Sequence, residues 1–305
     1  MEHLMKAIEE SVKREGIDLI GFAPKSRFES VKPENNPFAI FPEGKTVILL
    51  GKRICRGSLR GIEEGTNFTD YKLFGSSWLE DDFLSLACYG LTNTLEDHGF
   101  EAVPVFPNPA ELAPTGVAVD NDRPAPNVFP DFEYAAIACG LCEIGVNGLP
   151  LSPVFGSRQR FHMIITDAEL PATPLLTQTV CDGCMECAKA CPLGAISTTE
   201  FDEIEICGKV MKVAKINYEI CKTCKNGAFP NRLSSKAKPD RVAAICNRTC
   251  MICLEEKKRI SNLFEKEFRR APEWTIGEKT AEKNCQATNK LVDSSSKSGN
   301  RGSGK

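Results

Sequence analysis

The sequence has little that would direct it out of the cytoplasm or into a membrane. Residues 1–16, MEHLMKAIEESVKREG, contain no cationic segment followed by an apolar stretch and no twin-arginine pair. Apolar runs such as TVILLG have about the length of a strand and fall far short of the roughly twenty residues that a membrane-spanning helix needs. We therefore expect a soluble, cytoplasmic protein without a membrane partner.

The sequence also has no excess of positive charge and few histidines. The formal net charge is -3, and the sequence contains 3 histidines. Proteins that bind duplex nucleic acid usually present a strong positive field, so nucleic acid is not an expected partner. His98 and His162 stand outside any metal-binding spacing, and we expect both to be structural.

Cysteine, in contrast, is abundant. The chain has 15 cysteines, and ten of them lie between residues 181 and 255. Thiols in the cytosol are kept reduced, so these cysteines do not indicate a disulfide framework. Thiolates in such numbers suggest bound metal, and we expect a small domain that is ordered by its metal as much as by its core.

The run CDGCMECAKACP at residues 181–192 has the spacing C-x2-C-x2-C-x3-C followed by proline. This spacing matches the bacterial ferredoxin run that binds a 4Fe-4S cluster, with Cys181, Cys184, Cys187 and Cys191 as ligands. In ferredoxins with two clusters, the fourth cysteine of such a run serves the other cluster. The run therefore predicts a second cluster.

Downstream cysteines offer more thiolates than a second cluster requires. We assign the first three cysteines of the run and one downstream cysteine, for which Cys250 is the candidate, to the first cluster. Cys191 and three downstream cysteines form the second. Structural zinc is an alternative, because two C-x2-C pairs also occur, although it leaves the run unexplained. The downstream cysteines are Cys221, Cys224, Cys246, Cys250 and Cys253, the last of which is a possible spare. The cysteines expected to be small buried hydrophobic residues are Cys55, Cys88, Cys139, Cys142, Cys207 and Cys285.

Hydrophobic periodicity predicts alternating helices and strands in the first part of the chain. Helices are expected at 3–16, 83–100 and 131–141, strands at 17–24, 45–54, 101–107, 149–155 and 160–170, and an irregular segment at 104–130. This alternation favours a layered α/β domain over residues 1–175. The cysteine-rich domain is expected at 176–256, a C-terminal extension at 257–285, and a polar, disordered tail at 286–305.

The segment GLCEIGVNGLPLSPVFGSRQRFHMIITD, residues 140–167, resembles the GLGWIGKNTLL region of epoxyqueuosine reductases and corrinoid-dependent reductive dehalogenases. The ferredoxin run follows it in the same order. GIDLIGFAP is similar to the opening strand of this superfamily, and TDYK at 69–72 is similar to a D-Y-H stretch. PDRVAAICNRTCMICLEE, at 239–256, is similar to an iron–sulfur segment of the superfamily. That similarity favours Cys221, Cys224, Cys246 and Cys250 as ligands, and the resemblance covers about residues 16–256.

The resemblance implies an α/β (α+β) fold, with a nitroreductase-like layered core that holds cobalamin and a ferredoxin-like domain with two 4Fe-4S clusters. It implies an oxidoreductase that takes electrons from a donor such as ferredoxin or flavodoxin. These electrons would pass to a base-off corrinoid and reduce an unidentified small-molecule or corrinoid substrate. Tyr71 is the candidate proton donor, with a packed tyrosine as the alternative. The expected cobalamin contacts are Gly140, Leu141, Gly145, Asn147, Gly148, Ser152, Phe155, Gly156, Ser157 and Arg158.

Several positions depart from the family pattern. Leu141 and Cys142 replace the family's Gly-Trp, Val146 replaces a lysine, and Pro126 stands where epoxyqueuosine reductases have an acidic proton donor. Epoxyqueuosine is therefore not the expected substrate. A second hypothesis is a ferredoxin-like electron carrier or reductive activator that serves a partner's cofactor and holds no corrinoid of its own.

Overall fold

A four-stranded antiparallel sheet forms the centre of the α/β core. The computed structural model describes residues 1–266 and residue 268. The strands are β1 (Leu19–Pro24), β2 (Thr46–Arg53), β3 (Ala102–Val105) and β6 (Gln159–Thr166), in the order β1-β2-β6-β3. Neighbouring strands pair as Phe22 with Ile48 and Ile48 with Ile164. Four predicted strands, at 17–24, 45–54, 101–107 and 160–170, are confirmed.

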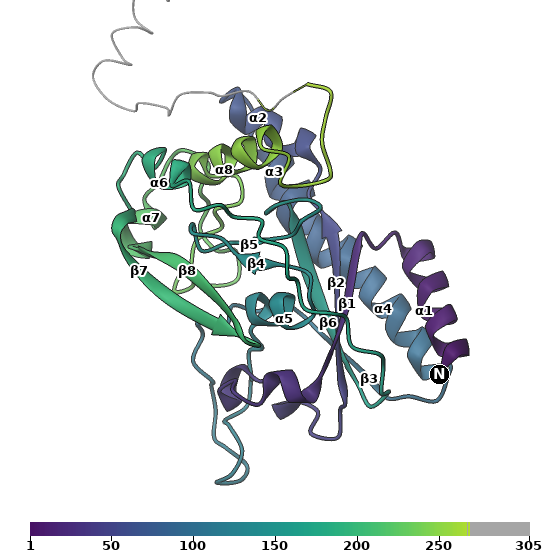
Figure 1. Cartoon of the computed structure of the whole chain (residues 1–305). Coiled ribbons are helices and arrows are strands. Elements are labelled where there is room, and N and C mark those ends of the chain that lie inside the picture. The colour runs from purple at the N-terminus through teal and green to yellow at the C-terminus, as the bar shows by residue number, and fades with distance from the viewer. Residues whose placement is uncertain (267, 269–305) are drawn as a thin grey trace, which may run out of the picture. The chain divides into compact units, whose positions relative to one another are not determined.

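Helices cover both faces of this sheet. Figure 1 shows α1 (Glu2–Glu15) and α4 (Ser85–Glu96) on one side and α5 (Phe132–Ala138) on the other. The α5 helix shares a buried apolar cluster with Val47, Leu49 and Met163, while α1 packs against α4. All three predicted helices are confirmed. The α1 helix ends at Gly16, whose φ of 62° is the left-handed conformation that glycine adopts readily at a helix C-terminus.

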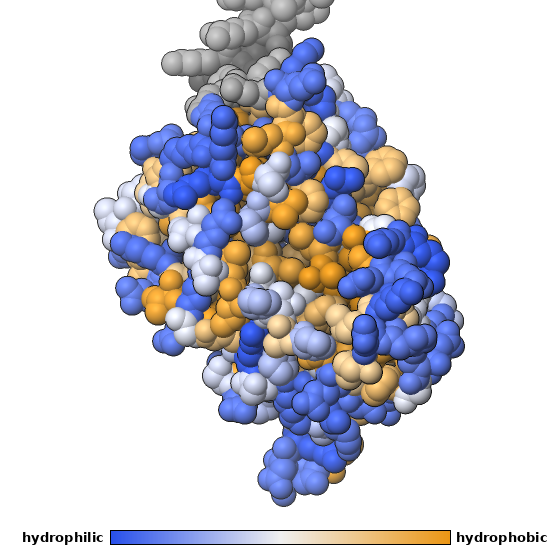
Figure 2. Space-filling model, turned by 45° about the vertical axis from the view of Figure 1, so that its right-hand side comes forward, coloured by the Kyte–Doolittle hydropathy of each residue, from blue (hydrophilic) through white to orange (hydrophobic). Residues whose placement is uncertain are grey.

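A continuous helical run leads into α4. It consists of α3 (Thr69–Lys72), the π-helical segment η5 (Leu73–Leu84) and α4 itself, and it begins earlier than the predicted helix at 83–100. This run exposes several large apolar side chains, namely Phe74, Trp78, Phe83, Leu86 and Tyr89. Figure 2 shows apolar surface among charged side chains on one face of the molecule. No described helix has both the length and the apolar character needed to cross a bilayer.

The predicted strand at 149–155 is largely wrong. Only β5 (Pro150–Leu151) is extended, and it pairs with β4 (Glu143–Ile144). Pro150 and Pro153 have no N–H to donate to a strand ladder, and Gly156, with φ of 61°, turns the chain back toward Ser152. The segment between Val105 and Phe132 contains no helix or strand, as predicted.

The cysteine-rich part is built on a long hairpin and three helices. Its elements are α6 (Glu186–Lys189), β7 (Ile196–Ile206), β8 (Lys209–Ile216), α7 (Tyr218–Lys222) and α8 (Ile245–Glu256). Cys207 and Gly208 form the hairpin turn, both with positive φ, as a two-residue type I′ turn requires. Figure 1 shows α6, α7 and α8 gathered beside this hairpin.

The described residues form one compact unit. Met251 and Leu254 of α8 pack against Leu151, which joins the cysteine-rich part to the α/β core. The remaining short turns are η1 (Lys25–Phe28), η2 (Pro33–Asn35), η3 (Pro37–Ala39), η4 (Arg56–Leu59) and α2 (Arg60–Glu63). Cys285, most of the predicted extension at 257–285 and the whole predicted tail at 286–305 lie outside the described residues.

Candidate functional site

Four cysteines from two separate segments surround one small cavity. Cys181, Cys184 and Cys187 come from the loop that leads into α6, and Cys250 comes from α8. Cys253 also borders this cavity, together with Val146 and Asn147. The loop can turn sharply because Gly183 has a φ of 71° and Met185 a φ of 61°. The structure thus brings the candidate crossover residue Cys250 to the first three cysteines of the run.

A second set of four cysteines lies beside the first. Cys246, at the start of α8, is close enough to interact electrostatically with Cys191, Cys221 and Cys224. Cys221 lies on α7, and Cys191 follows α6. We call Cys181, Cys184, Cys187 and Cys250 the first group, and Cys191, Cys221, Cys224 and Cys246 the second group. Cys187 of the first group also interacts with Cys246 of the second, so the two groups adjoin.

The donor chemistry of each group suits a 4Fe-4S cluster. Burial, together with the negative charge of neighbouring thiolates, raises the pKa of Cys187 to about 12 and that of Cys246 to about 11. Four thiolates can therefore exist together there only beside a strong positive charge, which iron supplies. Backbone N–H groups of Val146 and Ala195 donate to the sulfurs of Cys181 and Cys191, at 3.5 and 3.3 Å. Such bonds tune cluster potentials.

The arrangement does not support the zinc alternative. That alternative joins the pair Cys221 and Cys224 to the pair Cys250 and Cys253, whereas the structure places these pairs in different groups. Within residues 1–266, no three cysteine, histidine, aspartate or glutamate side chains converge on a point that suits a single ion.

Three of the cysteines predicted to be inert are buried in the core. Burial raises the pKa of Cys88 to about 12 and the pKa of both Cys139 and Cys142 further. Cys207 is half-buried in the hairpin turn. The prediction for Cys55 is wrong, because this residue is exposed at the end of β2, where the chain leaves the sheet.

The residues predicted to contact cobalamin do not form a cradle. A Cβ added to Gly140 would lie 2.1 Å from the Pro174 carbonyl oxygen, and one added to Gly156 would lie 2.6 Å from the Met251 sulfur. At Gly145 and Gly148 the nearest atoms are also protein atoms, in Leu151 and Ile216. These glycines therefore permit close packing of the chain on itself rather than approach of a macrocycle.

The other predicted cobalamin contacts are occupied by internal packing and hydrogen bonds. Leu141 and Phe155 are buried, and Asn147 and Ser157 both bond to Asn247. Ser152 bonds to Gln159. Arg158 is 1% exposed and donates to the Ile54 carbonyl oxygen and to Asn262, so it is neither solvated nor placed to hold an external carboxylate. None of the ten residues lines either of the two larger cavities, and the set does not fit a corrinoid.

Tyr71 borders a cavity of about 370 Å³ between η5 and the loop that follows Phe229. Its hydroxyl donates to the Asp240 carboxylate at 2.8 Å, and Arg160 of β6 donates to both, at 3.0 and 2.6 Å. The Tyr71 ring stacks on Phe229 with a centroid separation of 5.4 Å. Three segments that are distant in the sequence therefore hold the phenol in one position.

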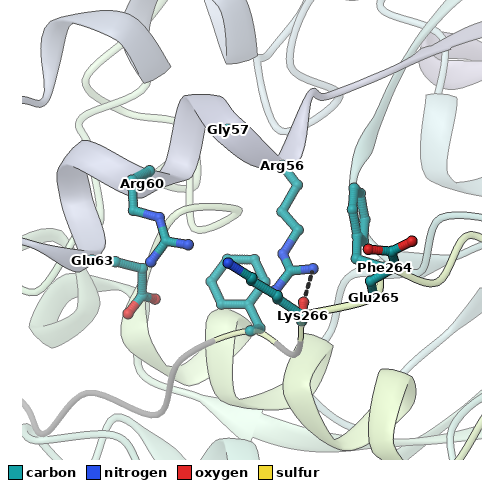
Figure 3. Close-up of a pocket in the computed structure, with 8 residues that line it drawn as sticks. Arg56, Gly57, Arg60, Glu63, Phe264, Glu265 and Lys266 are labelled. Carbon is teal, nitrogen blue, oxygen red and sulfur yellow. Dashed lines mark hydrogen bonds between the residues drawn. The ribbon is translucent and has the colours of Figure 1, made fainter.

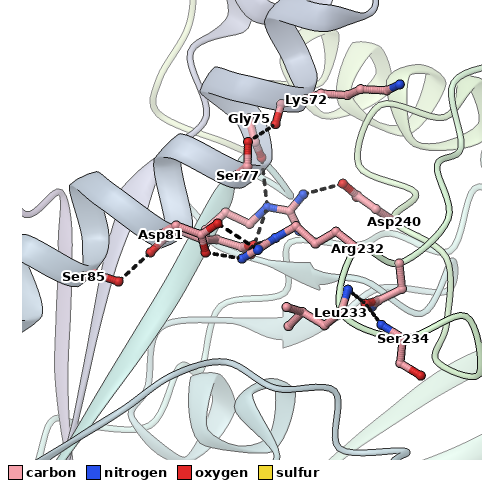
Figure 4. Close-up of polar contacts among 12 residues, drawn as sticks. Lys72, Gly75, Ser77, Asp81, Ser85, Arg232, Leu233, Ser234 and Asp240 are labelled. Atoms are coloured by element: carbon pink, nitrogen blue, oxygen red, sulfur yellow. Dashed lines mark hydrogen bonds and ion pairs between the residues drawn. The ribbon is translucent and has the colours of Figure 1, made fainter.

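Further charges line the same cavity. Arg232 pairs with Glu80 at 3.0 Å and with Asp81 at 2.6 Å, and Glu80 also approaches Arg160 at 3.6 Å. Figure 4 shows Arg232 and Asp240 reaching toward the helical run from the opposite loop. Sequence reasoning singled out Tyr71 but missed Arg160, Arg232 and Asp240, because only the fold brings them to Tyr71.

A separate cavity of about 430 Å³ lies beside α2, bordered by Arg56, Arg60 and Phe264 (Figure 3). Arg56 crosses it and donates to the Lys266 carbonyl oxygen at 2.8 Å. No cysteine of either group borders it. It is therefore distinct from the cysteine sites and from the cavity at Tyr71.

The environment of Tyr71 leads to a testable prediction about the pH at which its phenol ionises. Burial, followed by the negative charge of Asp240, raises the pKa of Tyr71 well above its usual value of 10.0. A phenol with a raised pKa stabilises the folded state at lower pH, and this stabilisation is lost as the pH rises through the folded-state pKa. In an absorbance titration of phenolate, the difference between the unchanged chain and Tyr71→Phe should appear only well above pH 10. A difference centred near pH 10 would contradict the buried environment.

Comparisons with known proteins agree with the cysteine chemistry. Residues 176–197 match the family model of the 4Fe-4S binding domain. Tetrachloroethene reductive dehalogenases of Desulfitobacterium hafniense and Dehalobacter restrictus are 26% identical over 226 residues, which cover 64% of this chain and 39% of each relative. The chain thus spans about two fifths of the length of these curated relatives. The resemblance to reductive dehalogenases is confirmed.

Two solved structures are also similar. A catabolic reductive dehalogenase in complex with 3-bromo-4-hydroxybenzoic acid has 15% identity and a TM-score of 0.48, and the match covers 80% of this chain and 31% of that one. An epoxyqueuosine reductase with a modified tRNA-Tyr stem loop has 17% identity and a TM-score of 0.43, over 64% of this chain and 53% of that one.

Proposed function

We propose that this chain is an iron–sulfur reductase that binds two 4Fe-4S clusters and passes electrons to a small molecule held beside Tyr71. The observation that carries the proposal is the division of eight cysteines into two groups of four that share helix α8. Cys246 and Cys250 are four residues apart on this helix, or about 6 Å along its axis. Electrons would cross only a short distance between the two groups.

The charges around the first group suit an acidic electron donor such as ferredoxin or flavodoxin. Lys257 and Arg259 border this group, and the Lys257 side chain is 44% exposed although it is paired with Asp182. Positive residues at such a rim favour encounter with a negatively charged partner. The second group adjoins Arg241, whose neighbour Asp240 lines the Tyr71 cavity. The order of electron flow that we propose is therefore donor, first group, second group, substrate.

The residues of the cavity would handle the proton. Reduction of a carbon–halogen bond, R–X + 2e⁻ + H⁺ → R–H + X⁻, needs one proton for two electrons, and bound clusters supply those electrons singly. The raised pKa of Tyr71 keeps its phenol protonated at neutral pH. Arg160 and Asp240 hold the hydroxyl in place, and the hydroxyl must turn from Asp240 to reach a substrate.

The corrinoid prediction has no structural support at the residues named for it. Gly140, Gly145 and Gly156 face protein atoms, and Arg158 is buried and bonded. We therefore route no electron step through cobalamin. The same observation favours the second candidate function, an electron carrier or reductive activator that delivers electrons to a cofactor held by a partner.

Substrate reduction by the cluster-loaded chain tests the proposal. The anaerobic, dithionite-reduced chain, freed of excess reductant, is mixed with tetrachloroethene or with 3-bromo-4-hydroxybenzoic acid. We expect bleached cluster absorbance to return with release of one halide for every two electrons, and Tyr71→Phe to slow that release without loss of iron. Rapid oxidation by a corrinoid protein or flavoprotein, with no halide from either probe, would favour the carrier. Gel filtration after addition of cobalamin tests corrinoid retention separately.

A further inference from the structure

Arg241 is a buried cation that forms no close ion pair with a carboxylate among the described residues. The residue is 2% exposed, and its Nη1 atom has no hydrogen-bond partner among the described residues. The buried Arg248 pairs with the carboxylate of Glu63, and the half-buried Arg160 pairs with that of Asp240. Glu133 interacts electrostatically with Arg241 but forms its ion pair with Lys238 instead. Burial of a charge without a close partner is costly, so a further anion is expected near the Arg241 guanidinium.

The position of Arg241 indicates which anion this is. Its guanidinium lies over the ring of Tyr218, with 5.4 Å between the Cζ atom and the ring centroid. Tyr218 and Cys221 are three residues apart on α7 and so share one face of that helix. Arg241 also precedes Cys246 by five residues, at the entry to α8. The side chain is therefore placed between segments that carry two cysteines of the second group.

Electrostatics agree with this placement. Burial raises the pKa of both Cys221 and Cys246, and Arg241 is the group that opposes this rise at each thiol. In the described part of the chain, no cation is among the main influences on the pKa of Cys181, Cys187 or Cys250 in the first group. Its neighbouring cations, Lys257 and Arg259, are more exposed to solvent, and Lys257 is paired with Asp182 at 2.5 Å. Solvent weakens the influence of such charges.

We propose that Arg241 raises the reduction potential of the cluster bound by the second group and so makes it the electron acceptor of the pair. This inference rests on the proposed function, in which both groups bind 4Fe-4S clusters. A cluster that gains an electron gains negative charge, which a buried guanidinium stabilises. With both clusters bound, one electron would pass from the first cluster, once the external donor had reduced it, to the second.

Redox titration of Arg241→Gln, followed by electron paramagnetic resonance under anaerobic conditions, tests the inference. At a fixed potential, the ratio of reduced to oxidised second cluster should fall about tenfold. For a one-electron couple this corresponds to a reduction potential that is lower by about 59 mV. The potential of the first cluster should stay unchanged. Arg241→Lys, which keeps the charge, should restore most of the ratio. The signal that remains in Cys250→Ala identifies the second cluster.

Lys225→Gln is the matched control, because Lys225 adjoins Cys224 but is exposed. It should leave both potentials unchanged. The inference is overturned if Arg241→Gln binds both clusters and changes neither potential, or changes both equally. If Arg241→Gln does not bind the second cluster, binding by Arg241→Lys supports a requirement for the charge, whereas failure of both variants indicates a packing role. An unchanged chain with about four irons instead of about eight would contradict the proposed function itself.

Discussion

Replacement of Cys250 by alanine is expected to remove about four of about eight bound irons and to leave the other cluster intact. Cys250 is the only residue of α8 in the first group, and it completes the set formed by Cys181, Cys184 and Cys187. Without it, three thiolates and a small space remain on that side. The second group keeps all four of its cysteines. Iron and sulfide analysis of anaerobically purified protein measures the loss.

Two other cysteines provide controls for this experiment. Cys253 borders the same cavity as Cys250, one helical turn further along α8, so Cys253→Ala tests whether proximity alone predicts a ligand. Cys88 lies in the core, where its thiol faces the Met163 carbonyl oxygen at 3.7 Å. Both variants should keep all of their iron. Full iron content in Cys250→Ala, together with loss of iron in Cys253→Ala, would identify Cys253 as the ligand instead of Cys250.

Replacement of Arg248 by methionine is expected to destabilise the fold by about 3–5 kcal/mol. Arg248 of α8 forms an ion pair with Glu63 of α2, and their side chains are 3% and 2% exposed. Arg248 also donates to the Ala243 carbonyl oxygen at 2.9 Å. Its removal leaves the Glu63 carboxylate buried without its cation. Because Arg248 lies between Cys246 and Cys250, the variant should also bind less iron.

The double variant Glu63→Met, Arg248→Met separates charge burial from packing. Replacement of a complete buried ion pair by apolar side chains is often neutral or stabilising. We therefore expect the double variant to regain most of the lost stability in denaturant unfolding monitored by circular dichroism. A double variant as unstable as Arg248→Met would show instead that the arginine acts through its own packing and its bond to Ala243.

Local patterns in the sequence were sufficient to predict three of the four cysteines in the first group and much of the sheet. The spacing of Cys181, Cys184 and Cys187 is a short-range property of one loop, and the buried β2 strand is an uninterrupted apolar run. The hairpin of β7 and β8 was missed, because its residues are mostly exposed and show no clear apolar period. Its turn places Cys207 at a positive φ, which the residue type does not predict.

Long-range packing explains the parts that the sequence could not predict. The hydroxyl of Tyr71 bonds to Asp240, 169 residues away, and no local pattern links the two. The glycines between Gly140 and Gly156 indicate a close approach to backbone but not which atoms approach. The resemblance assigned that role to cobalamin, whereas the structure fills it with Pro174, Leu151 and Met251.

The most direct test of two adjoining clusters is electron paramagnetic resonance of the fully reduced, anaerobically isolated chain. Because Cys246 and Cys250 are one helical turn apart on α8, two reduced 4Fe-4S clusters there should interact magnetically. We predict a signal that integrates to about two spins per chain, with broadening from spin–spin coupling that disappears in Cys250→Ala. A signal of about one spin without such broadening, or protein that contains zinc and no iron, would contradict the account.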